Sequence, residues 1–179
     1  LLRLRKLPIN ALSRMSLLAD ACRINALYVI SRGGKLPLPG CFSRLETILW
    51  LYENELGREH GGRDLYVSSC RDDAAALFSV LIALERVPFS ELHRLRQIDG
   101  APTRTDLEAI GVSVSGSSLA MAISKAKGNV LANRLRNLTR SAFVLMGEAE
   151  AQEGQLWESL ASAVSLRLHE VVTIVQLDA

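Results

Sequence analysis

Residues 142–178 read AFVLMGEAEAQEGQLWESLASAVSLRLHEVVTIVQLD, and this stretch decides the fold. The apolar runs 142–146 and 171–175 are typical of short buried strands. An acidic turn follows Gly147, and residues 155–168 then carry apolar side chains at helical spacing. A strand, a helix and a second strand joined by short turns predict two parallel strands with a right-handed crossover.

The same crossover indicates where a ligand would bind. In open parallel sheets, ligands bind beyond the carboxyl ends of the strands. We therefore expect a site near residues 147–150 and 176–178.

Composition narrows the class of protein. With 179 residues, of which 49% are hydrophobic, the chain can bury the core of one α/β domain over residues 1–179. The net charge of +2 comes from 21 basic and 19 acidic residues spread along the chain, so we expect no nucleic-acid partner. Apolar runs end well before about 18 residues, so we expect no membrane span. Cys22, Cys41 and Cys70 lie far apart, which favours reduced thiols and a cytoplasmic location.

Upstream of residue 142 the pattern is mainly helical. Ser43 and Glu46 have the spacing of a capping box, so we expect a helix to begin there after a Pro- and Gly-rich loop. The other expected elements are a helix over 13–30, a strand over 65–69, a helix capped by Asp72 or Asp73, a short helix from Ser90, an irregular connection over 99–116 and a helix from Ser117 or Ser118 to about Asn133.

Four stretches carry a family resemblance in the family's own order. They are RINALYVISRGGKLPLPGCFSRLETILWLY (23–52), YVSSCRDDAAALFSVLIALERVPFSELHRLRQ (66–97), SGSSLAMAISKAKGNVLANRL (115–135) and GEAEAQEGQLWE (147–158). They resemble the opening helices, the SKGH segment, the GSLGQGLS helix and the GDG loop of the transketolase N-terminal domain. The resemblance implies the thiamine diphosphate-binding fold, a three-layer parallel sheet with helices on both faces. It also implies one domain that is shortened at its C-terminal end.

The resemblance assigns a cofactor locus. It implies that thiamine diphosphate would contact Gly147, Glu148, Ala149 and Ser118. Magnesium would be held by Glu148 and Asp178, where the family has an aspartate and an asparagine. Magnesium tolerates little displacement from its octahedral shell at about 2.1 Å, so the extra methylene of Glu148 matters. Ala149 also places a methyl group where the family's glycine offers a bare amide.

Other family residues are replaced as well. Asp72, or Arg71 after a one-residue shift, stands where the SKGH segment has its histidine. Ser117, Ala120 and Ala122 match glycines of GSLGQG, and each added side chain is expected to narrow the approach of the diphosphate. The three histidines lie outside the matched positions and are expected at the surface or at helix ends: His60, His93 and His169.

The acidic residues of this turn can also be explained without a ligand. Glu148, Glu150 and Glu153 would each favour the positive N-terminus of the following helix by a few tenths to about 1 kcal/mol. Trp157 and Glu158 keep the family's WE pair, which is expected to support packing and not chemistry.

The resemblance implies a component of a two-subunit transketolase-like enzyme that transfers a two-carbon ketol or acyl unit. A separate C-terminal-type subunit would supply the glutamate that activates the cofactor, so no catalytic residue is assigned here and the chain alone is expected to be inactive. The alternative is a cofactor-free pseudoenzyme subunit that supports or regulates that partner. The small side chains over 120–128 permit close approach of another backbone, which predicts a homo- or hetero-oligomer.

Overall fold

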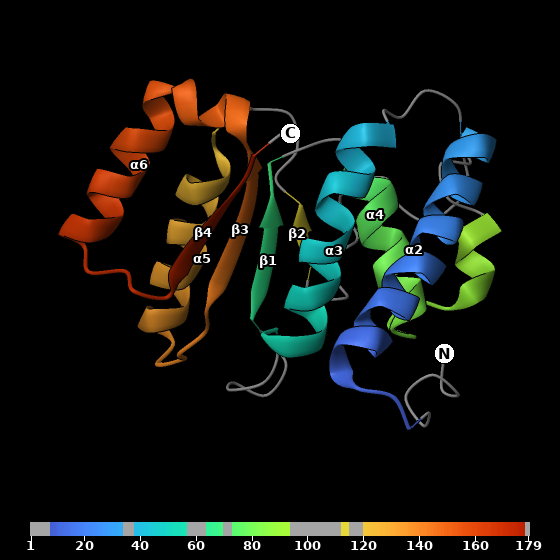
Figure 1. Ribbon diagram of the computed structural model, residues 1–179. Helices are drawn as coiled ribbons and strands as arrows, with labels where there is room; N and C mark the ends of the chain where they lie inside the picture. Colours follow the sequence, from blue (N-terminus) through green and yellow to red (C-terminus); the bar gives the residue numbers. More distant parts are fainter. Residues whose placement is uncertain are drawn as a thin grey trace. The chain divides into compact units, whose positions relative to one another are not determined.

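The computed structural model describes residues 8–33, 38–56, 64–69, 73–93, 112–114 and 120–177. They fall into two compact units, drawn with their secondary structure in Figure 1. A helical unit comprises residues 1–54 and 72–103, and a sheet unit comprises residues 55–71 and 104–179.

The helical unit is built around one helix that is almost entirely buried. Its elements are α2 (Ala11–Gly33), α3 (Leu38–Asn54), α4 (Asp73–Ala83) and the 3-10 helix η1 (Phe89–His93). Every residue of α4 except Ala74 is buried, as expected for a helix that is apolar on all sides and packs against both α2 and α3. The first residue of α4, Asp73, lies 3.3 Å from the guanidinium of Arg44, and both side chains are buried. This ion pair fixes the start of α4 to α3.

The start of α3 corrects one prediction. The helix begins at Leu38 and not at Ser43, because Pro39 is compatible with the first turn of a helix, where its missing N–H is not needed. The proposed capping box is therefore wrong. The Ser43 hydroxyl donates to the Gly40 carbonyl at 3.2 Å, and the Glu46 carboxylate forms an ion pair with Arg23 instead.

The sheet unit contains four parallel strands in the order β2-β1-β3-β4. They are β1 (Leu65–Ser68), β2 (Val112–Val114), β3 (Ala142–Gly147) and β4 (Val171–Gln176). In register, Ala142 pairs with Leu65 on one side and with Val171 on the other. The prediction of two adjacent parallel strands is confirmed, and with it the α/β fold. The strand β2 was not predicted, because three residues are too few to give a periodic signal.

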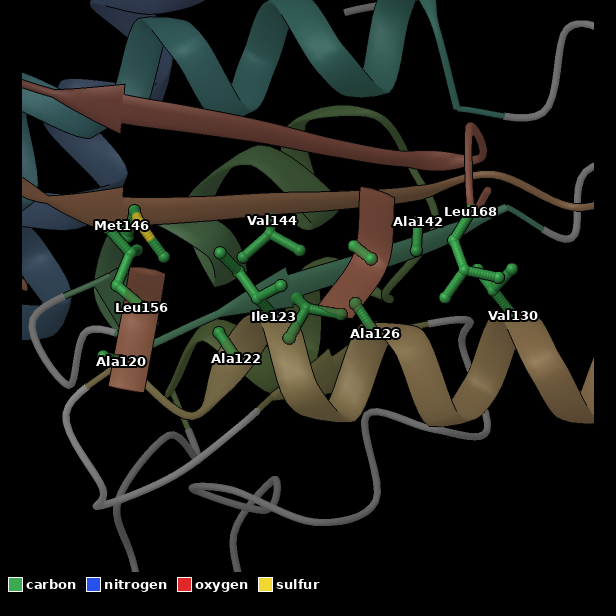
Figure 2. Close-up of a cluster of buried hydrophobic side chains, with 12 residues drawn as sticks. Ala120, Ala122, Ile123, Ala126, Val130, Ala142, Val144, Met146, Leu156 and Leu168 are labelled. Carbon is green, nitrogen blue, oxygen red and sulfur yellow. The ribbon is translucent and has the colours of Figure 1, made fainter. Parts of the chain in front are cut away.

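Helices α5 (Ala122–Leu135) and α6 (Gly154–Ser165) pack on one face of this sheet. Figure 2 shows Ile123 and Ala126 of α5 pointing toward Val144 of β3, within one cluster of buried side chains. The small residues of α5 thus bring it close to its own sheet, as the prediction of close packing required. Because Ala122 and Ala126 are buried within the sheet unit, this helix gives less support to an oligomer than the sequence suggested. Helices on a second face and a single domain over 1–179 stay predictions.

Two further sequence expectations concern the whole described chain. Cys22 and Cys41 are buried and are not in disulfides, as expected; Cys70 lies outside the described residues. Burial raises the pKa of the Cys22 thiol to about 12. No helix in the part of the chain that the structure describes is long and apolar enough to cross a membrane.

An ion pair ties the two helices of the sheet unit to β4. The Arg134 guanidinium, in the last turn of α5, donates to both oxygens of Glu170 at 2.7 and 2.6 Å. It also donates to the Arg167 carbonyl, just beyond α6, at 2.7 Å. The hydrogen bonds from Arg134 lower the pKa of the Glu170 carboxyl.

Ile123→Ala is expected to lower the free energy of unfolding by about 2–5 kcal/mol, because it opens a cavity between α5 and β3. The matched control is Leu135→Ala on the same helix. Leu135 is 87% exposed, so its loss is expected to cost less than about 0.5 kcal/mol. Urea denaturation followed by circular dichroism measures both. Equal losses would show that α5 does not pack as described.

Glu170→Gln is expected to destabilise the protein at pH 7 and to have no effect in acid. A lowered folded-state pKa gives stability that is present above the unfolded value, about 4.3, and is lost as pH falls through the folded value. Urea midpoints of wild type and variant should therefore differ at pH 7 and converge as the pH falls below 4. A constant difference across this range would mean that the ion pair does not account for the effect.

Candidate functional site

The carboxyl ends of the strands gather polar groups at one edge of the sheet. β1 is followed by Ser69, and β3 is followed by the 3-10 helix η3 (Glu148–Gln152). Because the strands are parallel, these two segments leave the sheet at the same edge. The expected ligand locus at the end of β3 thus lies where the topology places ligand sites.

Glu150 is the buried centre of this edge. Glu150 is only 4% exposed. Its carboxylate accepts hydrogen bonds from three segments. The donors are the Ser69 hydroxyl, the Ala120 backbone N–H at 2.8 Å and the Gly147 backbone N–H at 3.1 Å. Burying a carboxylate costs several kcal/mol, and hydrogen bonds to a charged group contribute about 1.5–3 kcal/mol each. The three bonds therefore offset the cost of burial.

The local backbone conformation directs the Glu150 carboxylate toward the Gly147 N–H. Gly147 is extended, with φ −89° and ψ 163°, and Glu150 is the third residue of the turn that follows. A glutamate at this position reaches back to the N–H ahead of a helix, as in half of a capping box. From the sequence, Glu150 was expected only to favour the positive end of α6. The signal that could have identified its role is the spacing Gly-x-x-Glu directly after a buried strand.

The predicted cofactor residues differ in exposure. Gly147 is buried at the end of β3, whereas Glu148 and Ala149 are exposed beside it. These three residues are consecutive in the chain, so their role in binding a cofactor stays a prediction. Ser118 and Asp178 lie outside the described residues. So do the replacements proposed at the SKGH histidine and at the first GSLGQG glycine: Arg71, Asp72 and Ser117.

The two alanines at family glycine positions do not act as expected. Ala120 and Ala122 are both 0% exposed, and their methyl groups belong to the hydrophobic cluster under α5 and α6 (Figure 2). Methyl groups directed into the core do not narrow an approach from solvent, so that interpretation is wrong for both. Ala120 has φ 59°, a left-handed conformation that favours glycine. The glycine of the family therefore matches this backbone, and the alanine keeps it under strain.

Trp157 ties the acidic turn to α6. Trp157 is 60% exposed, and its indole N–H donates to the Ala151 carbonyl at 2.9 Å. Trp157 thus supports the turn through this hydrogen bond, whereas the packing role expected of the WE pair stays a prediction. His93 contacts the Tyr28 hydroxyl at 2.7 Å within the helical unit, and His169 is exposed after α6. The third, His60, is outside the described residues.

The donor chemistry suits a hard cation. Among the described residues, no three His, Cys, Asp or Glu side chains are close enough to hold a metal ion together. Magnesium, however, is usually bound by one or two carboxylates together with phosphate oxygens and water. The Glu148 carboxylate, exposed at the end of β3, fits that pattern, whereas Glu150 does not because its oxygens already accept three hydrogen bonds.

Comparison with known proteins gives one consistent family. No protein-family model matches the chain. It is similar to an uncharacterised transketolase family protein of Sinorhizobium fredii, with 29% identity over 122 residues that cover 67% of this chain and 44% of the relative. Transketolase-like protein 2 of Homo sapiens is 24% identical over 163 residues, which cover 87% of this chain and 26% of the relative. The 6-deoxy-6-sulfo-D-fructose transketolase subunit SqwG of a Clostridium species is 29% identical over 112 residues, which cover 62% and 41%.

The chain spans less than half the length of each of these relatives. These matches agree with the resemblance carried by the four stretches of sequence, so the chain is similar to the transketolase family.

Proposed function

We propose that this chain is the cofactor-binding component of a two-subunit transketolase-like enzyme that transfers a two-carbon ketol or acyl unit. The observation that carries the proposal is the exposed Glu148 carboxylate at the end of β3, where the family has its metal-binding aspartate. A relative that is itself named as a subunit supports a division of the enzyme between chains.

The chain's own residues would bind and orient the cofactor. Glu148 and Asp178 would hold magnesium, which would neutralise charge on the diphosphate. Gly147, Ala149 and Ser118 would line the diphosphate. When bound, thiamine diphosphate supplies the nucleophilic carbon that takes up and passes on the two-carbon unit. The activating glutamate would come from a C-terminal-type partner subunit, so we expect the chain alone to be inactive.

A cofactor-free pseudoenzyme is the alternative, and two exposed groups favour it. Glu148 has one methylene more than aspartate, which displaces the oxygens from the position that an octahedral magnesium ion requires. The Ala149 methyl is exposed beside it, where a diphosphate would approach the backbone. In this alternative the chain keeps the fold and its contacts with the partner but supports or regulates that subunit without cofactor.

A calorimetric titration with thiamine diphosphate and magnesium separates the two functions. The chain is titrated alone and again in the presence of a transketolase C-terminal-type subunit. Saturable, magnesium-dependent binding at micromolar concentration supports the enzyme component. An absence of binding under both conditions, together with a stable complex of the two chains, would favour the pseudoenzyme.

Ala149→Gly is expected to raise the affinity for thiamine diphosphate with magnesium about fivefold. Without the methyl, the diphosphate can approach the backbone amide and gain about one hydrogen bond. The matched control is Ala122→Gly, which restores another glycine of the family's pattern. Its methyl lies in the core, so this variant is expected to lose stability, by about 1 kcal/mol, with no gain in affinity.

The triple variant Glu148→Asp, Ala149→Gly and Asp178→Asn extends this test to the metal. Restoring the shorter carboxylate and the asparagine is expected to add to the effect of Ala149→Gly, giving tenfold or more overall, about 1.4 kcal/mol. Calorimetry at saturating magnesium measures the change. An unchanged affinity in the triple variant would place the cofactor elsewhere.

A further inference from the structure

Three segments that are distant in the sequence meet at one carboxylate. Ser69 follows β1, Gly147 ends β3, and Ala120 lies two residues ahead of α5. All three donate to Glu150, whose Oε1 accepts from Ser69 and Gly147 and whose Oε2 accepts from Ala120. The Ser69 backbone also donates to the Leu145 carbonyl at 3.3 Å, so the end of β1 is joined to β3 as well.

We propose that Glu150 is the positioning residue of the cofactor locus: it fastens the start of α5 to the ends of β1 and β3. This inference rests on the proposed function, because it assumes that the diphosphate binds at this edge. Glu150 itself would not contact the cofactor, since it is buried and its oxygens already accept hydrogen bonds.

The hydrogen bond from the Ala120 N–H to Glu150 bears directly on how this edge would bind an anion. The first N–H groups of a helix lack partners within the helix and carry partial positive charge, so they bind phosphate well when correctly placed. Ala120 is held in a left-handed conformation directly before α5. Its N–H is fixed by the Glu150 carboxylate, and this fixes the point from which α5 begins.

The chemistry of the three donors requires a carboxylate. A glutamine in the same place has one oxygen and one NH2 group, so at least one donor would face another donor. An aspartate keeps the charge but is one methylene too short to reach all three. The glutamine substitution therefore tests the need for the charge, and the aspartate substitution tests the need for the length of the side chain.

The test compares Glu150→Gln, Glu150→Asp and Ser69→Ala with the control Glu158→Gln, which makes the same chemical change at an exposed site on α6. One readout is hydrogen exchange of the Ala120 and Gly147 amides by NMR. The other is calorimetric affinity for thiamine diphosphate with magnesium, in the presence of the partner subunit if binding requires it. Both are measured well below the melting temperature of each variant.

We expect Glu150→Gln and Glu150→Asp to speed exchange of the Ala120 amide and to weaken cofactor binding by about tenfold, the loss of a charge-assisted hydrogen bond. Ser69→Ala leaves both amide bonds in place, so it should weaken binding only about threefold. If the Glu150 variants do not fold, Ser69→Ala still tests the inference. Glu158→Gln should match wild type in both readouts.

Two results would overturn the inference. One is a folded Glu150 variant that is less stable but binds the cofactor as tightly as wild type, because Glu150 would then be structural only. The other is unchanged exchange of the Ala120 amide in Glu150→Gln. If wild type binds no cofactor at all, the proposed function fails; amide exchange then decides separately whether Glu150 anchors α5.

Discussion

The parallel pairing of β3 with both β1 and β4 is the constraint on which the sheet unit depends. It aligns Ser68 with Leu145 and Gly147 with Gln176, so three strands end at one edge. The alternate residues of β3 then face α5 and α6 in one buried cluster. Everything proposed for this edge follows from that register, because a shift of one residue would exchange the faces of β3. The polar turn after Gly147 would then lose its donors on the neighbouring strand.

Sequence periodicity predicted the elements whose signal is local. The runs 142–146 and 171–175 and the helical spacing between them were sufficient for β3, α6 and β4. The start of α3 was misjudged because Pro39 suits both a loop and a first helical turn. The role of Glu150 was missed for a different reason. Two of its donors, Ser69 and Ala120, are 81 and 30 residues away, and no local pattern reports such contacts.

The alanines show why the same substitution has different consequences at different positions. Ala120 and Ala122 place their methyl groups in the core, where they add apolar contact to β3 and α6. At Ala120 this contact comes with a left-handed backbone, which costs about 1–2 kcal/mol for a residue with a side chain. Burying a methyl returns about 0.8 kcal/mol, so it offsets only part of this cost. Ala149, exposed at the strand end, has no such compensation.

Glu148 and Glu150 differ in burial, and for that reason the roles proposed for them differ. They are two residues apart on the same 3-10 helix, yet one is exposed and the other is 4% exposed. The exposed Glu148 carboxylate is accessible to a cation from solvent. The buried Glu150 carboxylate has exchanged water for three fixed donors. A metal ion at this edge would therefore be bound by Glu148, and the geometry of its surroundings would be set by Glu150. Loss of metal binding through Glu148 would leave the anchor of α5 intact, which is how a member of this family could keep its fold after losing its cofactor.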